Sequence, residues 1–217
     1  MSRRDQLKAI PIFAALSATA LEAVEASMVL KKLPPGAVLV EEGAVEGCAF
    51  AVLSGRLKVS TAVSGRTIAL NIVGPGTLIG ELAMLDPSPR SASAVALDPV
   101  RVLVLHRRDL VPILRRHPDA ALAMMRVLAR QIRQRSDDLA AQTALPLPLR
   151  LRRALEDLAD RFGLDTPDGR LIDVALSQGE LGQLVGASRE SINKQLRSWR
   201  SDGSVLMEGG YITLRRV

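Results

Sequence analysis

The 217-residue sequence contains a single cysteine, Cys48, and only two histidines, His106 and His117. One cysteine excludes a disulfide within the chain and an iron–sulfur cluster held by the thiolates of one subunit. Both histidines lie at the ends of expected strands or helices, so we do not expect a haem ligand. We find no Ser-His-Asp arrangement and no spacing typical of metal ligands. The sequence therefore predicts neither an enzyme nor a metal, haem or iron–sulfur protein.

The sequence also lacks an apolar run of the roughly 20 residues that a membrane span requires. Arg3 and Arg4 precede an uncharged run over 9–21 that superficially resembles a signal peptide. Its apolar residues recur at helical spacings, however, so we expect two short amphipathic helices, with Ser17 as the N-cap of the second. Together with the lone cysteine, this favours a cytoplasmic protein without a membrane partner.

Basic residues are in excess, with 29 Lys and Arg against 23 Asp and Glu and a net charge of +6. This balance favours a polyanionic partner, either nucleic acid or an anionic membrane surface. Between residues 33 and 105, short apolar runs alternate with glycine- and proline-containing turns, which predicts an all-β barrel or sandwich. The expected strands are Val38–Val40, Ala49–Leu53, Leu57–Thr61, Thr67–Ile72, Ser93–Leu97 and Val100–Leu105.

A short helix is expected near Asp109–Arg115, followed by a long one, since no glycine or proline occurs from Asp119 to Thr143. Along the long helix, spacings of three and four alternate as in a coiled-coil seam, at Met125, Leu128, Ile132, Arg135, Leu139 and Gln142. This pattern predicts a homodimer. The alternative is a single helix packed on its own domain, because the seam is short.

The segment Leu145-Pro146-Leu147-Pro148 must end the long helix, because proline removes a backbone donor and disfavours helix in its predecessor. We therefore expect three parts: an N-terminal β domain over 1–116, a dimerisation helix over 117–145 and a C-terminal domain over 146–217. The last part is expected to contain a helix at Leu149–Phe162, a turn at Thr166–Gly169, two short helices and a hairpin around Gly209.

The two short helices have the features of a helix-turn-helix. Ser177 and Glu180 form a capping-box pattern that opens a helix ending at Gly186, and a second helix is expected at Arg189–Arg200. In this motif the first residues of the second helix meet base edges. The predicted DNA-binding residues are Ser188, Arg189, Glu190, Lys194 and Arg197, whereas the inward face carries Ile192, Leu196 and Trp199.

The charges on this helix suit the reading of bases. Arginine bonds guanine O6 and N7 bidentately, glutamate accepts from cytosine N4, and lysine reaches a second guanine. The alternative is a solvated helix face with an Arg189–Glu190 pair. The strands after Gly203 predict a two-stranded wing, and Arg215 and Arg216 beyond it are either phosphate contacts or a solvated tail.

A second constellation consists of Glu81 and Arg90, which lie nine residues apart around a short turn between strands. A guanidinium matches the single negative charge of a cyclic phosphodiester, and a buried carboxylate accepts from a ribose hydroxyl. Taken alone, two such residues are by default interpreted as a structural ion pair across a turn.

Two stretches of the chain resemble a known family. Gly80-Glu81-Leu82 with Arg90-Ser91-Ala92 resembles the phosphate-binding cassette of cyclic-nucleotide domains, and Gly186-Ala187-Ser188-Arg189-Glu190 resembles the start of a family recognition helix. On these motifs the chain is identified as a member of the cyclic-AMP receptor protein and fumarate-nitrate regulator family. The resemblance implies an α+β fold with an N-terminal jelly-roll-like β-roll that binds a cyclic nucleotide, a long dimerisation helix and a C-terminal winged helix-turn-helix.

The resemblance also implies roles for particular residues. Glu81 would hold the ribose 2′-hydroxyl, Arg90 and Ser91 the cyclic phosphate, and backbone groups of three residues would line the pocket: Gly80, Leu82 and Ala92. Arg135 and Ser136 align with the polar pair that meets the purine. Cyclic-AMP receptors often carry threonine in place of Arg135, and an arginine here favours guanine O6 and N7. Cyclic AMP is thus the first expectation and cyclic GMP the alternative.

The function that follows is a cyclic-nucleotide-responsive transcription regulator. It would bind a palindromic, GTGA-like site on double-stranded DNA as a homodimer, and we expect RNA polymerase as a further partner. The alternative is an effector-independent regulator whose β-roll serves only as a scaffold. A third hypothesis, an enzyme with a regulatory nucleotide domain, is weak because no residues remain for a catalytic domain.

Overall fold

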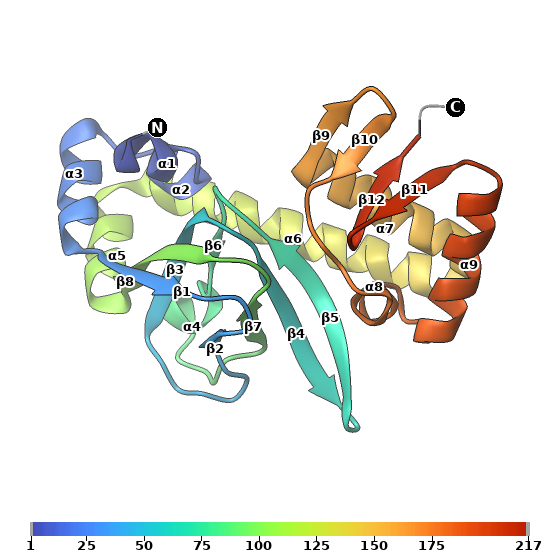
Figure 1. The fold of residues 1–217 in the computed structure, drawn as a ribbon. Coiled ribbons are helices and arrows are strands. Elements are labelled where there is room, and N and C mark those ends of the chain that lie inside the picture. The colour runs from blue at the N-terminus through green and yellow to red at the C-terminus, as the bar shows by residue number, and fades with distance from the viewer. Residues whose placement is uncertain (1, 216–217) are drawn as a thin grey trace. The chain divides into compact units, whose positions relative to one another are not determined.

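The structure is a computed structural model that describes residues 2–215 (Figure 1). Its internal contacts divide the chain into two compact units. The first contains the residues up to Gly65 together with Leu70–Gln134, and the second contains Arg66–Ala69 together with the residues from Arg135 onward. None of the helices within residues 2–215 combines the length and apolar composition that crossing a bilayer requires.

The N-terminal segment forms three short helices rather than the two predicted from the sequence. They are α1 (Arg3–Lys8), α2 (Pro11–Ala14) and α3 (Ala18–Ser27). A new helix starts at Pro11 because proline tolerates the first helical position, where the missing N–H has no partner within the helix. The predicted cap of the last helix is confirmed, since the Ala20 amide donates to Ser17 Oγ at 3.3 Å.

Eight strands follow between Val29 and His106, and all six predicted ones are among them. They are β1 (Val29–Leu33), β2 (Val38–Val40), β3 (Cys48–Ser54), β4 (Leu57–Val63), β5 (Arg66–Val73), β6 (Leu78–Ile79), β7 (Ser93–Ala96) and β8 (Val100–His106). They form two four-stranded sheets, ordered β1-β8-β3-β6 and β2-β7-β4-β5. The prediction missed β1 because this edge strand carries exposed Lys31 and Lys32 and does not alternate. It missed β6 because that strand has only two residues.

The central strand β3 is buried on both faces, so its sequence is apolar throughout. Its alternate residues enter two separate clusters, because successive side chains of a strand point to opposite faces. The first cluster packs the strand against the helices and contains Ala49, Ala51 and Leu53. The second cluster lies between the sheets and contains Cys48, Phe50 and Val52. The position of β3 is therefore fixed by apolar packing on both of its faces.

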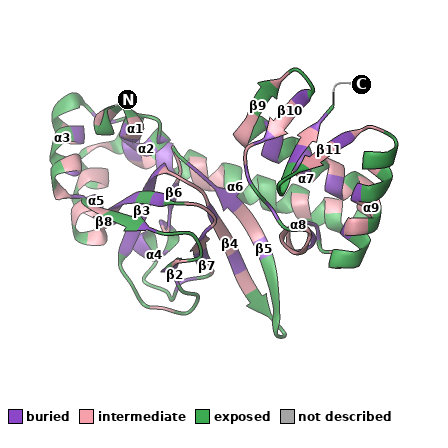
Figure 2. Cartoon of the chain, viewed as in Figure 1, coloured by how far each residue is buried: buried purple, intermediate pink, exposed green. Residues whose placement is uncertain are grey.

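Three further helices complete the first unit and lead out of it: α4 (Leu82–Leu85), α5 (Arg107–Arg116) and α6 (Pro118–Ala144). The predicted long helix is thus present, and it ends before Pro146 as expected. Over the described range 125–144 it has no buried residue (Figure 2). Its large exposed apolar side chains are Leu122, Met125, Ile132 and Leu139.

The second unit contains α7 (Leu147–Phe162), α8 (Gln178–Val185) and α9 (Arg189–Ser201). Its sheet has the order β11-β12-β10-β9, with β9 (Gly163–Thr166), β10 (Gly169–Ile172), β11 (Val205–Glu208) and β12 (Tyr211–Leu214). The sequence predicted only a turn at Thr166–Gly169, and the structure shows that it joins β9 to β10. Strands of four residues with a glycine at the start carry too little pattern to be recognised.

The helix-turn-helix geometry is confirmed in detail. Ser177 Oγ accepts from the Glu180 amide at 3.2 Å, and the Glu180 carboxylate accepts from the Ser177 amide at 2.9 Å. Gly186 ends α8 in the left-handed conformation, with φ +66°, which favours glycine. A second glycine of α8 is equally constrained, because a Cβ on Gly182 would lie 2.5 Å from the Ala187 carbonyl oxygen.

We predict that Gly182→Ala destabilises the second unit by about 2 kcal/mol, because the added methyl group overpacks the turn between α8 and α9. Chemical denaturation followed by the fluorescence of Trp199, the single tryptophan of the chain, measures this. Gly179→Ala is the matched control. Its Cβ would meet no atom closer than 3.8 Å, and alanine is the better helix former by about 1 kcal/mol. Equal stability of Gly182→Ala and the wild type would contradict the prediction.

Candidate functional site

The predicted cassette runs from the end of β6 through α4 to the start of β7. Gly80 follows β6 with a φ of +78°, a conformation that favours glycine. A Cβ at this position would lie 2.5 Å from Arg90 Nη1 and 3.3 Å from the Cys48 carbonyl oxygen. Gly80 is therefore needed for two reasons, its backbone conformation and the close approach of the Arg90 guanidinium.

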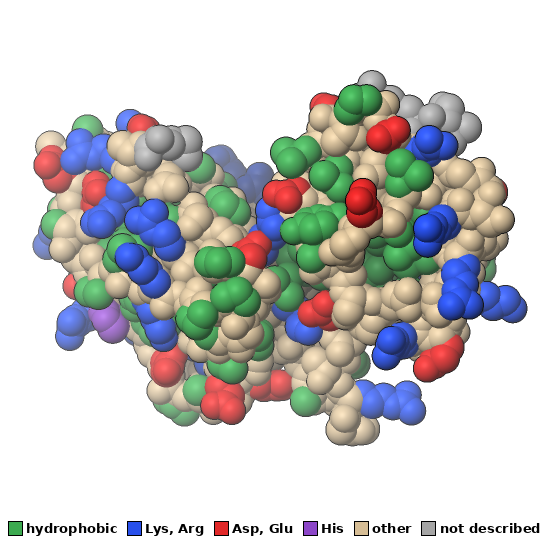
Figure 3. Space-filling model, viewed as in Figure 1, with side chains coloured by type: hydrophobic (Ala, Val, Ile, Leu, Met, Phe, Trp, Pro, Cys, Tyr) green, Lys and Arg blue, Asp and Glu red, His purple; other side chains and the backbone are tan. Residues whose placement is uncertain are grey.

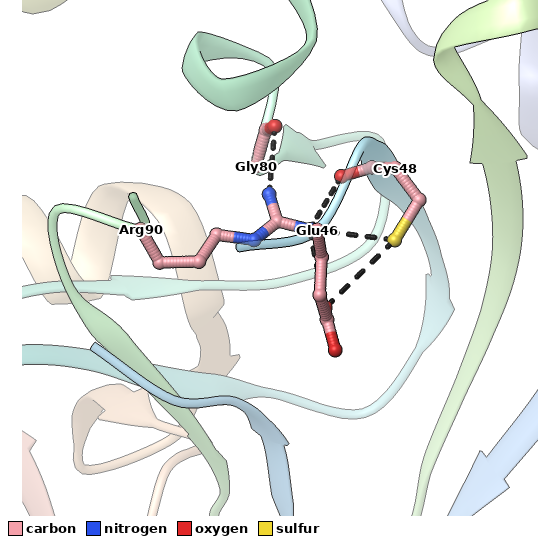
Figure 4. Close-up of polar contacts among 4 residues, drawn as sticks. All are labelled: Glu46, Cys48, Gly80 and Arg90. Atoms are coloured by element: carbon pink, nitrogen blue, oxygen red, sulfur yellow. Dashed lines mark hydrogen bonds and ion pairs between the residues drawn. The ribbon is translucent and has the colours of Figure 1, made fainter. Parts of the chain in front are cut away.

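Arg90 is a buried arginine, with only 4% of its surface exposed. Its Nη1 donates to the Gly80 carbonyl oxygen at 2.9 Å and its Nη2 to the Cys48 carbonyl oxygen at 2.6 Å (Figure 4). Nη2 also lies 3.3 Å from Cys48 Sγ, and the guanidinium carbon lies 5.6 Å from the centre of the Phe50 ring. The backbone carbonyls of Cys48 in β3 and of Gly80, the residue after β6, thus hold the guanidinium in one orientation.

The charge of Arg90 is only weakly compensated. Among residues 2–215, the carboxylate within 4.0 Å of its guanidinium is that of Glu46, whose Oε2 lies 3.5 Å from Nη2 and whose side chain is half exposed. The buried Nε of Arg90 has no hydrogen-bond acceptor among these residues. Since a buried charge is costly unless it is paired and bonded, this site favours the binding of an anion.

Cys48 contributes a neighbouring thiol rather than a reactive one. Burial raises the pKa of this thiol, and the opposing effect of the nearby Arg90 charge is smaller. The thiol therefore stays protonated at neutral pH, which disfavours its use as a nucleophile.

Glu81, the other predicted ligand residue, lies directly before α4 and is only 7% exposed. Burial raises the pKa of its carboxyl above the ordinary value of 4.5, against smaller lowering effects of its own backbone N–H, of Gln131 and of the Arg90 charge. Gln131 Nε2 on α6 donates to Glu81 Oε1 at 3.2 Å. This hydrogen bond connects the cassette directly to α6.

A pocket of about 200 Å³ adjoins Glu81 on the side of α6. Its lining is mainly apolar and comes from the α2 region, the turn before β6, and α6: Ile10, Pro11, Ile12, Gly76, Thr77, Leu78, Met124, Val127, Leu128, Arg130 and Gln131. The sequence analysis missed Gln131. The available signal was its spacing, one helical turn before Arg135 on the same helix.

The remaining predicted ligand residues are distributed differently. Leu82 and Ser91 are exposed, and Ala92 is half-buried. Arg90, Ser91 and Ala92 do not contribute to the lining of the pocket beside Glu81. Arg135 and Ser136 are exposed on α6, four and five residues beyond Gln131. Of the predicted set, the structure brings Gly80 and Arg90 into direct contact.

In the second unit, α9 presents a charged outer face. Arg189, Glu190, Lys194 and Arg197 are exposed, and Lys and Arg side chains gather over α9 in Figure 3. The opposite side of the helix carries buried Ile192 and Leu196, and Trp199 is half-buried. The division of the helix into an outer and an inner face is thus as predicted.

The first turn of α9 is fixed by side-chain caps. Ser188 Oγ accepts from the Ser191 amide at 3.2 Å, so this predicted DNA-binding residue serves as the N-cap. The pKa of Glu190 is lowered, first by its own backbone N–H and then by Ser188. Its carboxylate is therefore ionised at neutral pH and remains an acceptor.

Two features near α9 complete the description. Gln178 Nε2 donates to Asn193 Oδ1 at 3.3 Å and joins α8 to α9, a contact that the sequence analysis missed.

The predicted wing is the β11–β12 hairpin, which turns at Gly209 and Gly210, both with positive φ. Arg215 is exposed after β12, whereas Arg216 lies outside the described residues.

Comparisons with known proteins agree with this arrangement. Residues 30–117 match the cyclic nucleotide-binding domain family, and residues 149–217 match the Crp-like helix-turn-helix domain family. The CRP-like cAMP-activated global transcriptional regulator of Mycobacterium tuberculosis is 33% identical over 199 residues, which cover 91% of this chain and 89% of that protein. The cyclic AMP receptor protein of Thermus thermophilus is 30% identical over 212 residues, which cover 97% and 95%.

Among solved structures, the c-di-GMP-responsive global regulator CLP of Xanthomonas campestris matches with a TM-score of 0.80 at 20% identity. The match covers 93% of this chain and 100% of that one, and it supports the predicted α+β fold class. Because both domain families match in this order, and because the relatives that match over nearly their whole length are transcription regulators, the chain is a regulator and not an enzyme. It belongs to the cyclic-AMP receptor protein and fumarate-nitrate regulator family.

Proposed function

We propose that the chain is a cyclic-nucleotide-responsive transcription regulator that binds cyclic AMP in its cassette. The observation that carries this proposal is the buried guanidinium of Arg90. Two carbonyl oxygens orient it, its Nε has no acceptor among residues 2–215, and its nearest carboxylate is half exposed at 3.5 Å. A cyclic phosphodiester supplies the single negative charge and the oxygen acceptors that this site lacks.

Glu81 supports the same ligand through its sugar. A ribose 2′-hydroxyl donates to a carboxylate, and Glu81 is a buried acceptor in the same cassette. Gly80, Leu82, Ser91 and Ala92 complete the proposed contact set. Two relatives are named for cyclic AMP, which makes it the first choice. Cyclic GMP is the alternative, since Arg135, with Ser136, suits the guanine edge.

The proposed coupling begins at Gln131. Its hydrogen bond to Glu81 joins the cassette to α6, so a sugar that bonds Glu81 changes the contacts of that helix. The exposed apolar residues Met125 and Leu139 of α6 support a homodimer, because a second copy of the helix would remove them from water. The Leu145–Pro148 segment would then transmit the change to the C-terminal domain.

We assign residues 1–116 to the nucleotide-binding domain, 117–145 to the dimerisation helix and 146–217 to the DNA-binding domain. In the dimer, two copies of α9 would enter major grooves about 34–36 Å apart on a palindromic, GTGA-like site. Ser188, Arg189, Glu190, Lys194 and Arg197 form the proposed DNA contacts. A cytoplasmic location and a contact with RNA polymerase belong to the same proposal.

One observation favours the alternative, an effector-independent regulator. Glu81 accepts from Gln131, and Arg90 donates to two carbonyl oxygens, so contacts within the chain alone orient both side chains. DNA binding that is equally tight with and without cyclic nucleotide would select this alternative.

For the ligand, we predict that Arg90→Ala weakens cyclic AMP binding by about 100-fold, because the phosphate loses a buried cationic partner. Calorimetric titration with cyclic AMP and cyclic GMP measures the loss and ranks the two nucleotides. Arg101→Ala, an exposed arginine on β8, is the control and should bind like the wild type. Unchanged affinity in Arg90→Ala would show that the phosphate binds elsewhere.

For DNA, we predict that Arg189→Ala lowers affinity for a GTGA-containing palindrome about tenfold or more and reduces the preference over a scrambled duplex. Footprinting in saturating cyclic AMP measures both effects. Arg153→Ala, exposed on α7, removes the same charge away from α9 and should keep the preference. The proposed base reading fails if the variant still distinguishes the palindrome from the scrambled duplex as the wild type does.

A further prediction concerns the pH dependence of stability at Glu81. Because burial raises the folded-state pKa of Glu81 above 4.5, its contribution to stability is fully present below that pH and is lost as pH rises through the raised pKa. Glu81→Gln keeps an acceptor for Gln131 but cannot ionise. Its melting temperature should therefore rise relative to the wild type between pH 4.5 and pH 8. A difference that is the same at every pH would show that the carboxyl is not destabilised by burial.

A further inference from the structure

The loop between β2 and β3 carries Glu46, a residue that neither the cassette motif nor the proposed nucleotide contacts include. Its Oε2 lies 3.5 Å from Arg90 Nη2 and 4.0 Å from Cys48 Sγ (Figure 4). The two partners differ in exposure, since the Arg90 side chain is 3% exposed and that of Glu46 is 50% exposed. One member of the pair is thus fixed in the interior while the other reaches solvent.

Backbone hydrogen bonds anchor this loop on both sides of Glu46, to Arg90 before it and to Arg107 after it. The Gly43 amide donates to the Arg90 carbonyl oxygen at 2.9 Å, and the Arg90 amide donates to the Ala44 carbonyl oxygen at 2.9 Å. After Glu46, the Gly47 carbonyl oxygen accepts from the Arg107 amide at 2.8 Å. The backbone therefore keeps the Glu46 side chain next to the guanidinium, although the side chain itself is half exposed.

The position of Glu46 overlaps with the part of Arg90 that a phosphate needs. Nε and Nη2 form one edge of the guanidinium, and bidentate binding of a phosphate uses two neighbouring donors. Nε has no acceptor among residues 2–215, whereas Nη2 faces the Glu46 carboxylate. An anion that takes this edge must share it with Glu46 or displace Glu46 into solvent.

We propose that Glu46 is an internal counter-ion that competes with the ligand phosphate for Arg90 and thereby sets the affinity of the site. This inference rests on the proposed function. If the carboxylate stays in place, it repels the phosphate; if it leaves, its ion pair with Arg90 is lost. In both cases the acidic side chain lowers the affinity for an anionic ligand, and its exposed half allows it to move without unfolding the loop.

The sign of this effect separates competition from support. If Glu46 instead held Arg90 in its binding orientation, removal of its charge would weaken binding. The two backbone carbonyls of Gly80 and Cys48 already orient the guanidinium at 2.9 and 2.6 Å, which are shorter contacts than that of Glu46. We therefore expect removal of the charge to strengthen binding.

The test is calorimetric titration of the full chain with cyclic AMP, comparing the wild type with Glu46→Gln and Glu41→Gln. Glu46→Gln keeps the size of the side chain and should bind about two- to fivefold tighter, the range expected for loss of a partly exposed ion pair. Glu41→Gln removes the same charge from an exposed position of the same loop and should bind like the wild type. Arg90→Ala is included as the variant that removes the shared partner.

The outcomes separate the two proposals. Tighter binding in Glu46→Gln, including binding seen only in this variant, supports both. Equal or weaker binding in Glu46→Gln, with wild-type binding that Arg90→Ala abolishes, overturns the role of Glu46 and leaves the proposed function intact. An equal gain in Glu41→Gln shows a general charge effect and also overturns it. No cyclic AMP binding by any of the proteins overturns the inference together with the proposed function.

Discussion

The first unit is organised around a guanidinium that is buried between strands. An arginine with 4% exposure is costly to fold unless its donors and its charge are satisfied. Carbonyl groups of β3 and of the residue after β6 accept from Nη2 and Nη1, and a glycine at position 80 is needed to allow the approach. The charge is satisfied only in part. The buried guanidinium is therefore left with an unbonded Nε and a half-exposed carboxylate as its partner, which is the basis of the proposed anion site.

The neighbouring carboxyl of Glu81 adds a buried hydrogen-bond acceptor to the same cassette. Burial disfavours its ionised form, while Gln131 of α6 donates to it. A donor from a ligand would stabilise the ionised form, since each additional hydrogen bond to a carboxylate offsets part of the desolvation cost. In the proposed function, anion binding at Arg90 and hydroxyl binding at Glu81 are complementary. A small molecule that carries both groups would meet these two requirements together, next to α6.

Sequence patterns predicted those parts of the fold whose residues act locally. Ser17 and Ser177 cap helices because their hydroxyls bond amides a few residues away, and Gly186 ends a helix through its own backbone. Long-range requirements were less visible. Strand β1 depends on pairing with β8, and β9 depends on β10, so neither segment carries a clear pattern of its own.

The candidate site shows the same limit. Glu81 and Arg90 stand in a recognisable motif, whereas Glu46 and Gln131 come from segments about 40 to 50 residues away in the sequence. Glu46 reaches the cassette through the antiparallel pairing of the strands, and Gln131 reaches it because α6 packs beside Glu81. A spacing rule along the chain does not detect a contact of this kind, because the residues between the partners fold into other elements.

The edge strand β1 has a consequence for the behaviour of the protein in concentrated solution. It is the outer strand of its sheet, so one side of its backbone has amides and carbonyls that pair with no strand among residues 2–215. Lys31 and Lys32 project from this strand into water. Lysines on an edge strand oppose the intermolecular strand pairing that leads to aggregation, because pairing two such edges would bring like charges of the two copies together on each face of the sheet. The two lysines that make β1 hard to recognise in the sequence thus also disfavour pairing between the edge strands of two protein molecules.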